Sequence, residues 1–106
     1  MVDKVLNGIL PYKEVRFLQP PRETYAVYFD NVDYYGADKL IGLENHSVRI
    51  EVYSEQINND IEKQIEKRLI DFELEFNKGE RVWLNSEQIY MTVYYFDYIE
   101  KIKEEK

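Results

Sequence analysis

The spacing of apolar residues along the chain predicts two helices. In residues 1–10 apolar side chains recur every three or four positions, which is typical of a short amphipathic helix, and Pro11 stops it. A longer stripe with the same spacing predicts the main helix, and it consists of Ile57, Ile61, Ile65, Leu69, Phe72 and Phe76. Asn58 and Asn59 are both suitable N-caps. The end of this helix stays open, because residues 73–76 can also be extended.

Alternation of apolar and polar residues predicts four strands. Residues 24–32 and 46–54 alternate in the manner of half-buried strands, and in the second of these Val48, Ile50 and Val52 share one face. Residues 81–84 and 89–98 are expected to pair as a hairpin around the turn-like Asn85–Ser86. In the last strand both alternating sets are apolar or aromatic, so both of its faces are expected to be covered.

These elements predict an α+β fold in the order α-β-β-α-β-β. We expect a two-layer sandwich with a mainly antiparallel four-stranded sheet, one long helix and a short N-terminal helix. One domain is expected over residues 1–106, with a helix and connector at residues 1–22 and a frayed charged tail at residues 100–106. Because one helix covers only one side of a sheet, the aromatic second face should need a partner.

The charge of the chain argues against nucleic-acid recognition. The net charge is −7, and residues 23–106 carry ten basic and nineteen acidic side chains. A duplex-binding surface needs clustered Lys and Arg to displace counterions from phosphate, whereas here acids outnumber bases. The absence of cysteine excludes disulfides and thiolate sites. No apolar run long enough for a membrane span is present, and the N-terminus does not resemble a signal peptide.

The acid-rich stretch at residues 30–44 is the best candidate for chemistry, and a loop is expected over residues 33–45. As a calcium loop counted from Asp33 it fails, because Tyr35 and Ala37 occupy ligand positions and Asp38 stands where glycine is needed. His46 is the sole histidine, and no nucleophile motif or glycine-rich phosphate loop accompanies it. We therefore expect no catalytic, cofactor or metal site, no cofactor, and no enzyme activity.

The same stretch carries apolar side chains that are unusual in a loop. Together with the aromatic last strand, they predict a surface that docks on other copies of the chain or on other proteins. The residues predicted to form this interface are Tyr34, Tyr35, Leu40, Ile41, Leu43, Tyr90, Tyr94, Phe96 and Tyr98. Packing of the loop onto its own core is the alternative. A small monomeric binding or regulatory module with a pocket on the aromatic face is the alternative function.

Several segments resemble the tail-completion proteins of long-tailed bacteriophages and prophages, also called tail terminator or head–tail joining proteins. The similarity covers residues 23–101 and includes a Tyr-rich first strand followed by Gly36-Ala37-Asp38. Further similar segments are a strand that ends at residues 51–54, a helix that contains Glu62 and Ile65, and a last strand that opens with Glu87 and Tyr90. These motifs are loose patterns of strand and helix residues.

The resemblance implies a virion structural protein at the tail–head junction, assembled in the bacterial cytoplasm. Such proteins form a ring, generally a hexamer, that caps the tail tube, stops its polymerisation and provides the surface on which the head docks. The implied partners are copies of the chain itself, the tail-tube protein and the head connector or stopper protein. DNA is implied only as cargo that passes through the lumen, without specific binding, and no membrane is involved.

Overall fold

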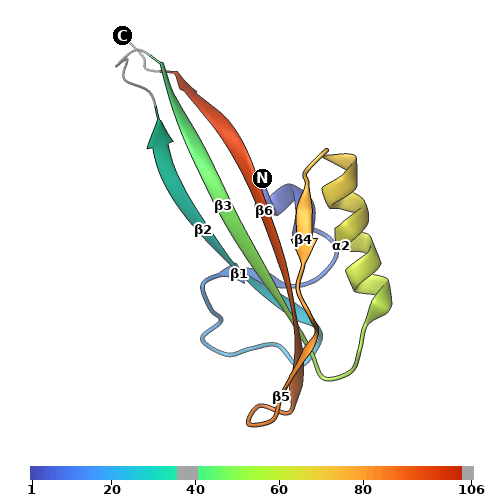
Figure 1. The fold of residues 1–106 in the computed structure, drawn as a ribbon. Helices are drawn as coiled ribbons and strands as arrows, with labels where there is room; N and C mark the ends of the chain where they lie inside the picture. Colours follow the sequence, from blue (N-terminus) through green and yellow to red (C-terminus); the bar gives the residue numbers. More distant parts are fainter. Residues whose placement is uncertain (36–40, 104–106) are drawn as a thin grey trace.

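The computed structural model describes residues 1–35 and 41–103 (Figure 1). Over these residues the elements are, in chain order, α1 (Val2–Leu6), β1 (Tyr12–Glu14), β2 (Tyr25–Tyr35), β3 (Ile41–Ser54), α2 (Asn59–Asp71), β4 (Phe76–Lys78), β5 (Val82–Leu84) and β6 (Ile89–Lys103). No helix among them is long and apolar enough to cross a membrane.

The sheet differs from the predicted one. Within the described residues, six strands form one mixed sheet in the order β1-β2-β3-β6-β4, with β5 pairing separately with β6. Strand β1 runs parallel to β2, and all other pairs are antiparallel. The expectation of a mainly antiparallel four-stranded sheet with one long helix is therefore wrong: two strands of three residues were missed, and both helices are short.

The loop predicted at residues 33–45 is wrong for those of its residues that the structure describes. Residues 33–35 belong to β2 and residues 41–45 to β3, and these strands pair in unbroken register from Tyr25↔Tyr53 to Tyr35↔Leu43. Strand β3 then pairs with β6 over its whole length, from Ile41↔Lys103 to Ser54↔Tyr90. Residues 100–103, expected to fray, are thus the end of β6. Residues 36–40, which include Leu40 and Asp38, lie outside the described residues.

Helix α2 is shorter than its apolar stripe. Asn58 is the N-cap, and its side chain accepts a hydrogen bond from the Ile61 amide at 3.2 Å. The helix ends at Asp71, and Glu73 then adopts a left-handed backbone conformation with φ of 57°. A non-glycine residue in this region breaks helical geometry, so the chain turns back and Phe76 enters β4. The sequence left open whether residues 73–76 are helical or extended, and the extended alternative is confirmed for Phe76.

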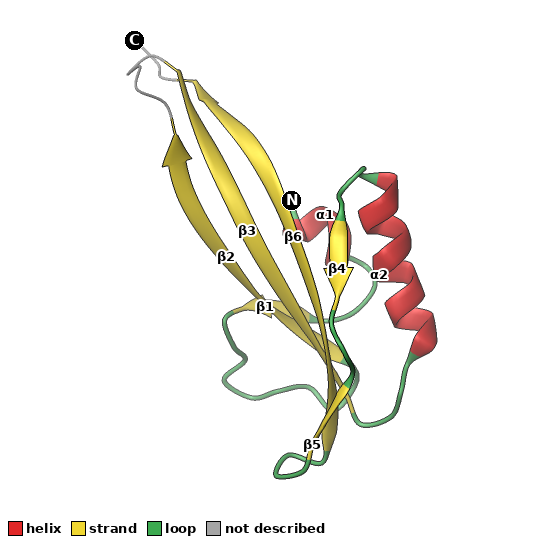
Figure 2. Ribbon diagram, in the orientation of Figure 1, coloured by secondary structure: helices red, strands yellow, loops and turns green. Residues whose placement is uncertain are grey.

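The core lies between the helices and one face of the sheet (Figure 2). Four helix residues are fully buried: Val5, Leu6, Ile65 and Leu69. They pack against a set of apolar side chains from the sheet. This set comprises Ala26 of β2, Val48, Ile50 and Val52 of β3, and Tyr94 and Phe96 of β6. Arg68 of α2 also donates a hydrogen bond of 2.6 Å to the Asn7 carbonyl, which joins α2 to the end of α1.

Three strands continue beyond the helix layer (Figure 2). We call this part the blade: residues 31–35 of β2, 41–47 of β3 and 97–103 of β6, which pair in register from Asn31↔Ser47 and Ser47↔Asp97 outward. The blade makes the molecule elongated, with extents of 50 × 29 × 24 Å.

Candidate functional site

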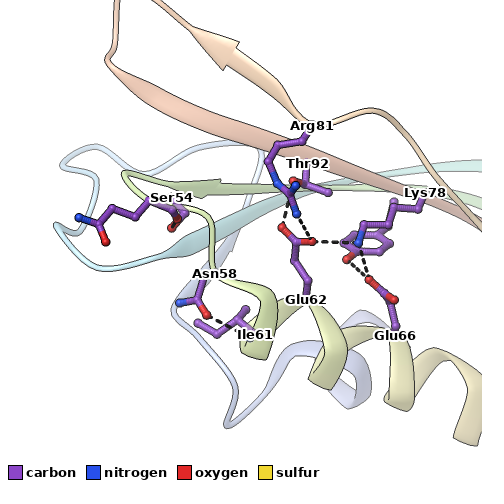
Figure 3. Close-up of polar contacts among 10 residues, drawn as sticks. Ser54, Asn58, Ile61, Glu62, Glu66, Lys78, Arg81 and Thr92 are labelled. Atoms are coloured by element: carbon purple, nitrogen blue, oxygen red, sulfur yellow. Dashed lines mark hydrogen bonds and ion pairs between the residues drawn. The ribbon is translucent and has the colours of Figure 1, made fainter.

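A buried carboxylate network fixes α2 to the sheet. Glu62 faces the sheet, with only 4% of the residue exposed. Its oxygens accept hydrogen bonds from Arg81 at 2.7 Å, Lys78 at 2.9 Å and Thr92 at 3.2 Å. One turn later, Glu66 accepts from Lys78 at 2.8 Å and from the Tyr94 hydroxyl at 2.7 Å. Figure 3 shows both carboxylates projecting from α2 toward these partners.

The protonation states in this network suit a structural role. Burial alone raises the pKa of the Glu62 carboxyl, but the hydrogen bonds and charges of Arg81 and Lys78 outweigh it, so the net pKa lies below its ordinary value. Burial and the Glu66 hydrogen bond hold the pKa of Tyr94 far above its ordinary value. Glu62 is therefore ionised at neutral pH and its oxygens are fully engaged, which leaves it unsuited to act as a general base.

A second polar cluster lies where the blade begins. His46 of β3 is 9% exposed as a side chain, and its Nδ1 lies 3.0 and 2.9 Å from the two carboxylate oxygens of Asp30 on β2. Its Nε2 lies 3.1 Å from Glu44 Oε1 and 3.6 Å from Glu100 Oε2 of β6. Tyr98 stacks on the imidazole with ring centroids 4.3 Å apart. Three adjacent strands thus bring three carboxylates around one ring.

The electrostatics of this cluster are strongly negative. Burial lowers the pKa of His46, but the hydrogen bonds and charges of Asp30 and Glu44 raise it more, so the net pKa is above its ordinary value. Burial first, and then the nearby charges of Asp30, Glu100 and Glu44, raise the pKa of Tyr98 to about 12.

The predicted interface residues divide into two groups. Tyr34 is 71% exposed and Leu43 37% exposed, and both lie on the blade. Tyr35 ends β2 and Ile41 begins β3, again on the blade, whereas Leu40 lies outside the described residues. The predicted interface residues from the acid-rich stretch that the structure describes therefore all lie on the blade.

The β6 residues of that prediction need correction. Tyr94 and Phe96 are 0% and 3% exposed and pack in the core of this chain, because their face of β6 is the one that the helices cover. Tyr98 is half-buried against His46, and Tyr90 packs against Trp83 with ring centroids 4.7 Å apart. On the opposite face of β6, Tyr95 is 47% exposed, which is more than any of the four predicted β6 residues.

Sequence reasoning missed the exposed Ile99 and the surroundings of His46. Ile99 is 64% exposed in the blade part of β6, and the sequence placed this strand only as far as Tyr98. His46 and Glu44 are two residues apart on one strand face, a spacing that signals possible neighbours. The contributions of Asp30 and Glu100 depend on strand register and carry no such local signal.

The comparisons with known proteins concern the fold. No protein-family model matches the chain, and no curated protein matches it. Among solved structures, a chain described as "Virion of native gene transfer agent (GTA) particle" superposes with a TM-score of 0.54. The match covers 92% of this chain and 81% of that chain, at 12% sequence identity. The two chains therefore share a fold.

Proposed function

We propose that this protein is a non-catalytic structural component of a phage-type virion, which forms a ring on the end of the tail tube, stops its polymerisation and provides the surface for head docking. The observation that carries the proposal is the shared fold with a chain of a gene transfer agent virion. The resemblance of residues 23–101 to tail-completion proteins supports the same role independently.

The two edges of the blade support assembly into a ring. Strand β1 pairs with β2 only at Ala26–Tyr28, and β4 pairs with β6 only up to Phe96. Within the described residues, residues 29–35 of β2 and 97–103 of β6 therefore have no strand on their outer sides. Such edges present unpaired N–H and C=O groups and readily add another strand. Because the two edges differ, joining them is a head-to-tail contact, which generates a ring when the rotation closes.

Apolar side chains at the β6 edge favour this contact. Ile99 lies opposite Asn45 in the blade, and Leu43 lies two residues further along on the same face. An open depression beside the same edge is lined by residues 74–77 and 95–97, including Phe76 and Tyr95. A neighbouring β2 edge seated here would bury these side chains in addition to pairing its backbone.

The charge of the protein suits a channel for DNA. With a net charge of −7, a ring of copies repels phosphate, so DNA can pass through without binding. The partners we propose are further copies in a hexamer, the tail-tube protein and the head connector.

Deleting the gene from the phage or prophage that carries it tests this role. We expect filled heads and tails of uncontrolled length that do not join, seen by electron microscopy, with joining restored by the gene supplied in trans. Normal virions after deletion would overturn the proposed function.

A further inference from the structure

In its neutral form, the imidazole of His46 places a lone pair against negative charge, whereas a protonated ring donates from Nε2 to Glu44. Both oxygens of Asp30 lie within 3.0 Å of Nδ1, and an ionised carboxylate only accepts hydrogen bonds, so the proton of a neutral imidazole sits on Nδ1. Nε2 then carries its lone pair. The groups that it faces, Glu44 at 3.1 Å and Glu100 at 3.6 Å, are acceptors as well. A neutral ring therefore leaves this buried nitrogen without a donor.

Strand pairing increases the conflict. Glu44 and Glu100 are directly opposite each other across β3 and β6. Like charges at directly opposite positions destabilise a sheet. The register thus brings two carboxylates and one imidazole nitrogen to the same point, where a cation would satisfy all three.

We propose that His46 Nε2 and the carboxylates of Glu44 and Glu100 bind a divalent transition metal such as Zn²⁺. The donor atoms of these three residues all lie within 4.8 Å of one another. In a tetrahedral zinc site with bonds of about 2.0–2.1 Å, neighbouring ligand atoms are about 3.3 Å apart. The separations of 3.1 and 3.6 Å from Nε2 lie on either side of that value.

The residues around the ligands also suit a metal site. Asp30 orients the imidazole from its other nitrogen, as carboxylates do for metal-binding histidines. The Glu100 side chain is 61% exposed, so the fourth position is open to water. An imidazole among the ligands favours zinc and its neighbours over Ca²⁺ and Mg²⁺, which prefer oxygen ligands.

A bound metal would act on the blade. It would join β3 to β6 directly, and β2 through Asp30, at the point where the three strands leave the helix layer. The blade would become more rigid, and the two edges proposed for subunit contact would be held in fixed relative positions. The site itself is complete within one chain, so its existence does not depend on the ring.

The single histidine of the chain gives a direct readout of binding. The protein is treated with a chelator, and ZnCl₂ is added at pH 8 while the imidazole ¹⁵N resonances and the melting temperature are recorded. We expect the Nε2 resonance to shift and saturate at one zinc per chain, and the melting temperature to rise by mass action. Calcium at the same concentration should leave both unchanged.

Matched variants locate the ligands. Glu100→Gln removes one exposed ligand and should weaken zinc binding at least tenfold while the circular dichroism spectrum stays unchanged. Asp97→Asn removes the same charge from the opposite face of β6 and should bind zinc like the wild type. An Nε2 resonance that zinc leaves in place, or equal binding by the Glu100→Gln variant, overturns the proposal. Both readouts are made on unassembled chains, so failure of the ring would not imitate either result.

Discussion

At the scale of single residues, Glu62 is the side chain on which the packing of α2 depends most. Glu62→Gln removes the charge that Arg81 and Lys78 neutralise, and we expect the free energy of unfolding at pH 7 to fall by about 2 kcal/mol. Because the pKa of Glu62 is lowered in the folded state, its stabilisation is present above the unfolded pKa near 4.5 and is lost as the pH falls through the folded pKa. The difference between variant and wild type should therefore disappear in acid.

Urea unfolding between pH 3 and 8 measures this difference. The control is Glu80→Gln, the same change at an exposed position beside Arg81, which should leave stability within about 0.5 kcal/mol of the wild type. A deficit of the Glu62→Gln variant that stays the same size as the pH falls below 4.5 would mean that shape, and not charge, stabilises this site.

The position of Glu62 on the buried face of α2 could be foreseen from the sequence, but its partners could not. Glu62 precedes Ile65 by three residues and Leu69 by seven, which places it on the buried face of α2. Burial of Glu62 was nevertheless not predicted, because glutamate is rarely buried unless it is paired. Its partners Lys78 and Arg81 come from a segment whose position depends on the turn after α2, so no local pattern identifies them.

At the scale of elements, the sequence left two candidates for the N-cap of α2, Asn58 and Asn59, and the structure identifies Asn58. Asn58→Ala removes the side-chain acceptor for the Ile61 amide and should cost about 1 kcal/mol. Asn59→Ala, in the first turn and exposed, is the matched control and should be close to neutral. Both values come from chemical denaturation; an equal loss for the two variants would show that the cap is not the cause.

Most of the elements that the sequence predicted correctly bury one apolar face in the core. Strand β3 from His46 to Ser54, helix α2 and strand β6 do so, and alternation or helical spacing reports such a face. The blade is different, because neither of its faces packs against the helices. Residues such as Asp33 and Asn45 follow no apolar alternation there, so these ends of β2 and β3 were predicted to be a loop. Strands β1 and β4, at three residues each, are too short to show a period.

At the scale of the whole molecule, the shape joins a compact base to an open-edged blade. The base is stabilised by the helix–sheet core and the Glu62 network, so a single chain is expected to fold without partners. The blade contributes no core of its own, and its two different edges suit it for contact with other copies. The sequence pointed to an exposed surface that other subunits cover, but it placed part of that surface on Tyr94 and Phe96, which the helices bury.

Sedimentation of the purified protein over a wide concentration range tests head-to-tail assembly most directly. We expect a 12.9 kDa monomer that converts to one closed oligomer as concentration rises. Ile99→Asp at the β6 edge should abolish the oligomer, whereas Ile70→Asp, the same change at an equally exposed position (64%) on α2, should leave it intact. A wild-type chain that stays monomeric at every concentration, or an oligomer equally insensitive to both substitutions, would contradict assembly through the blade.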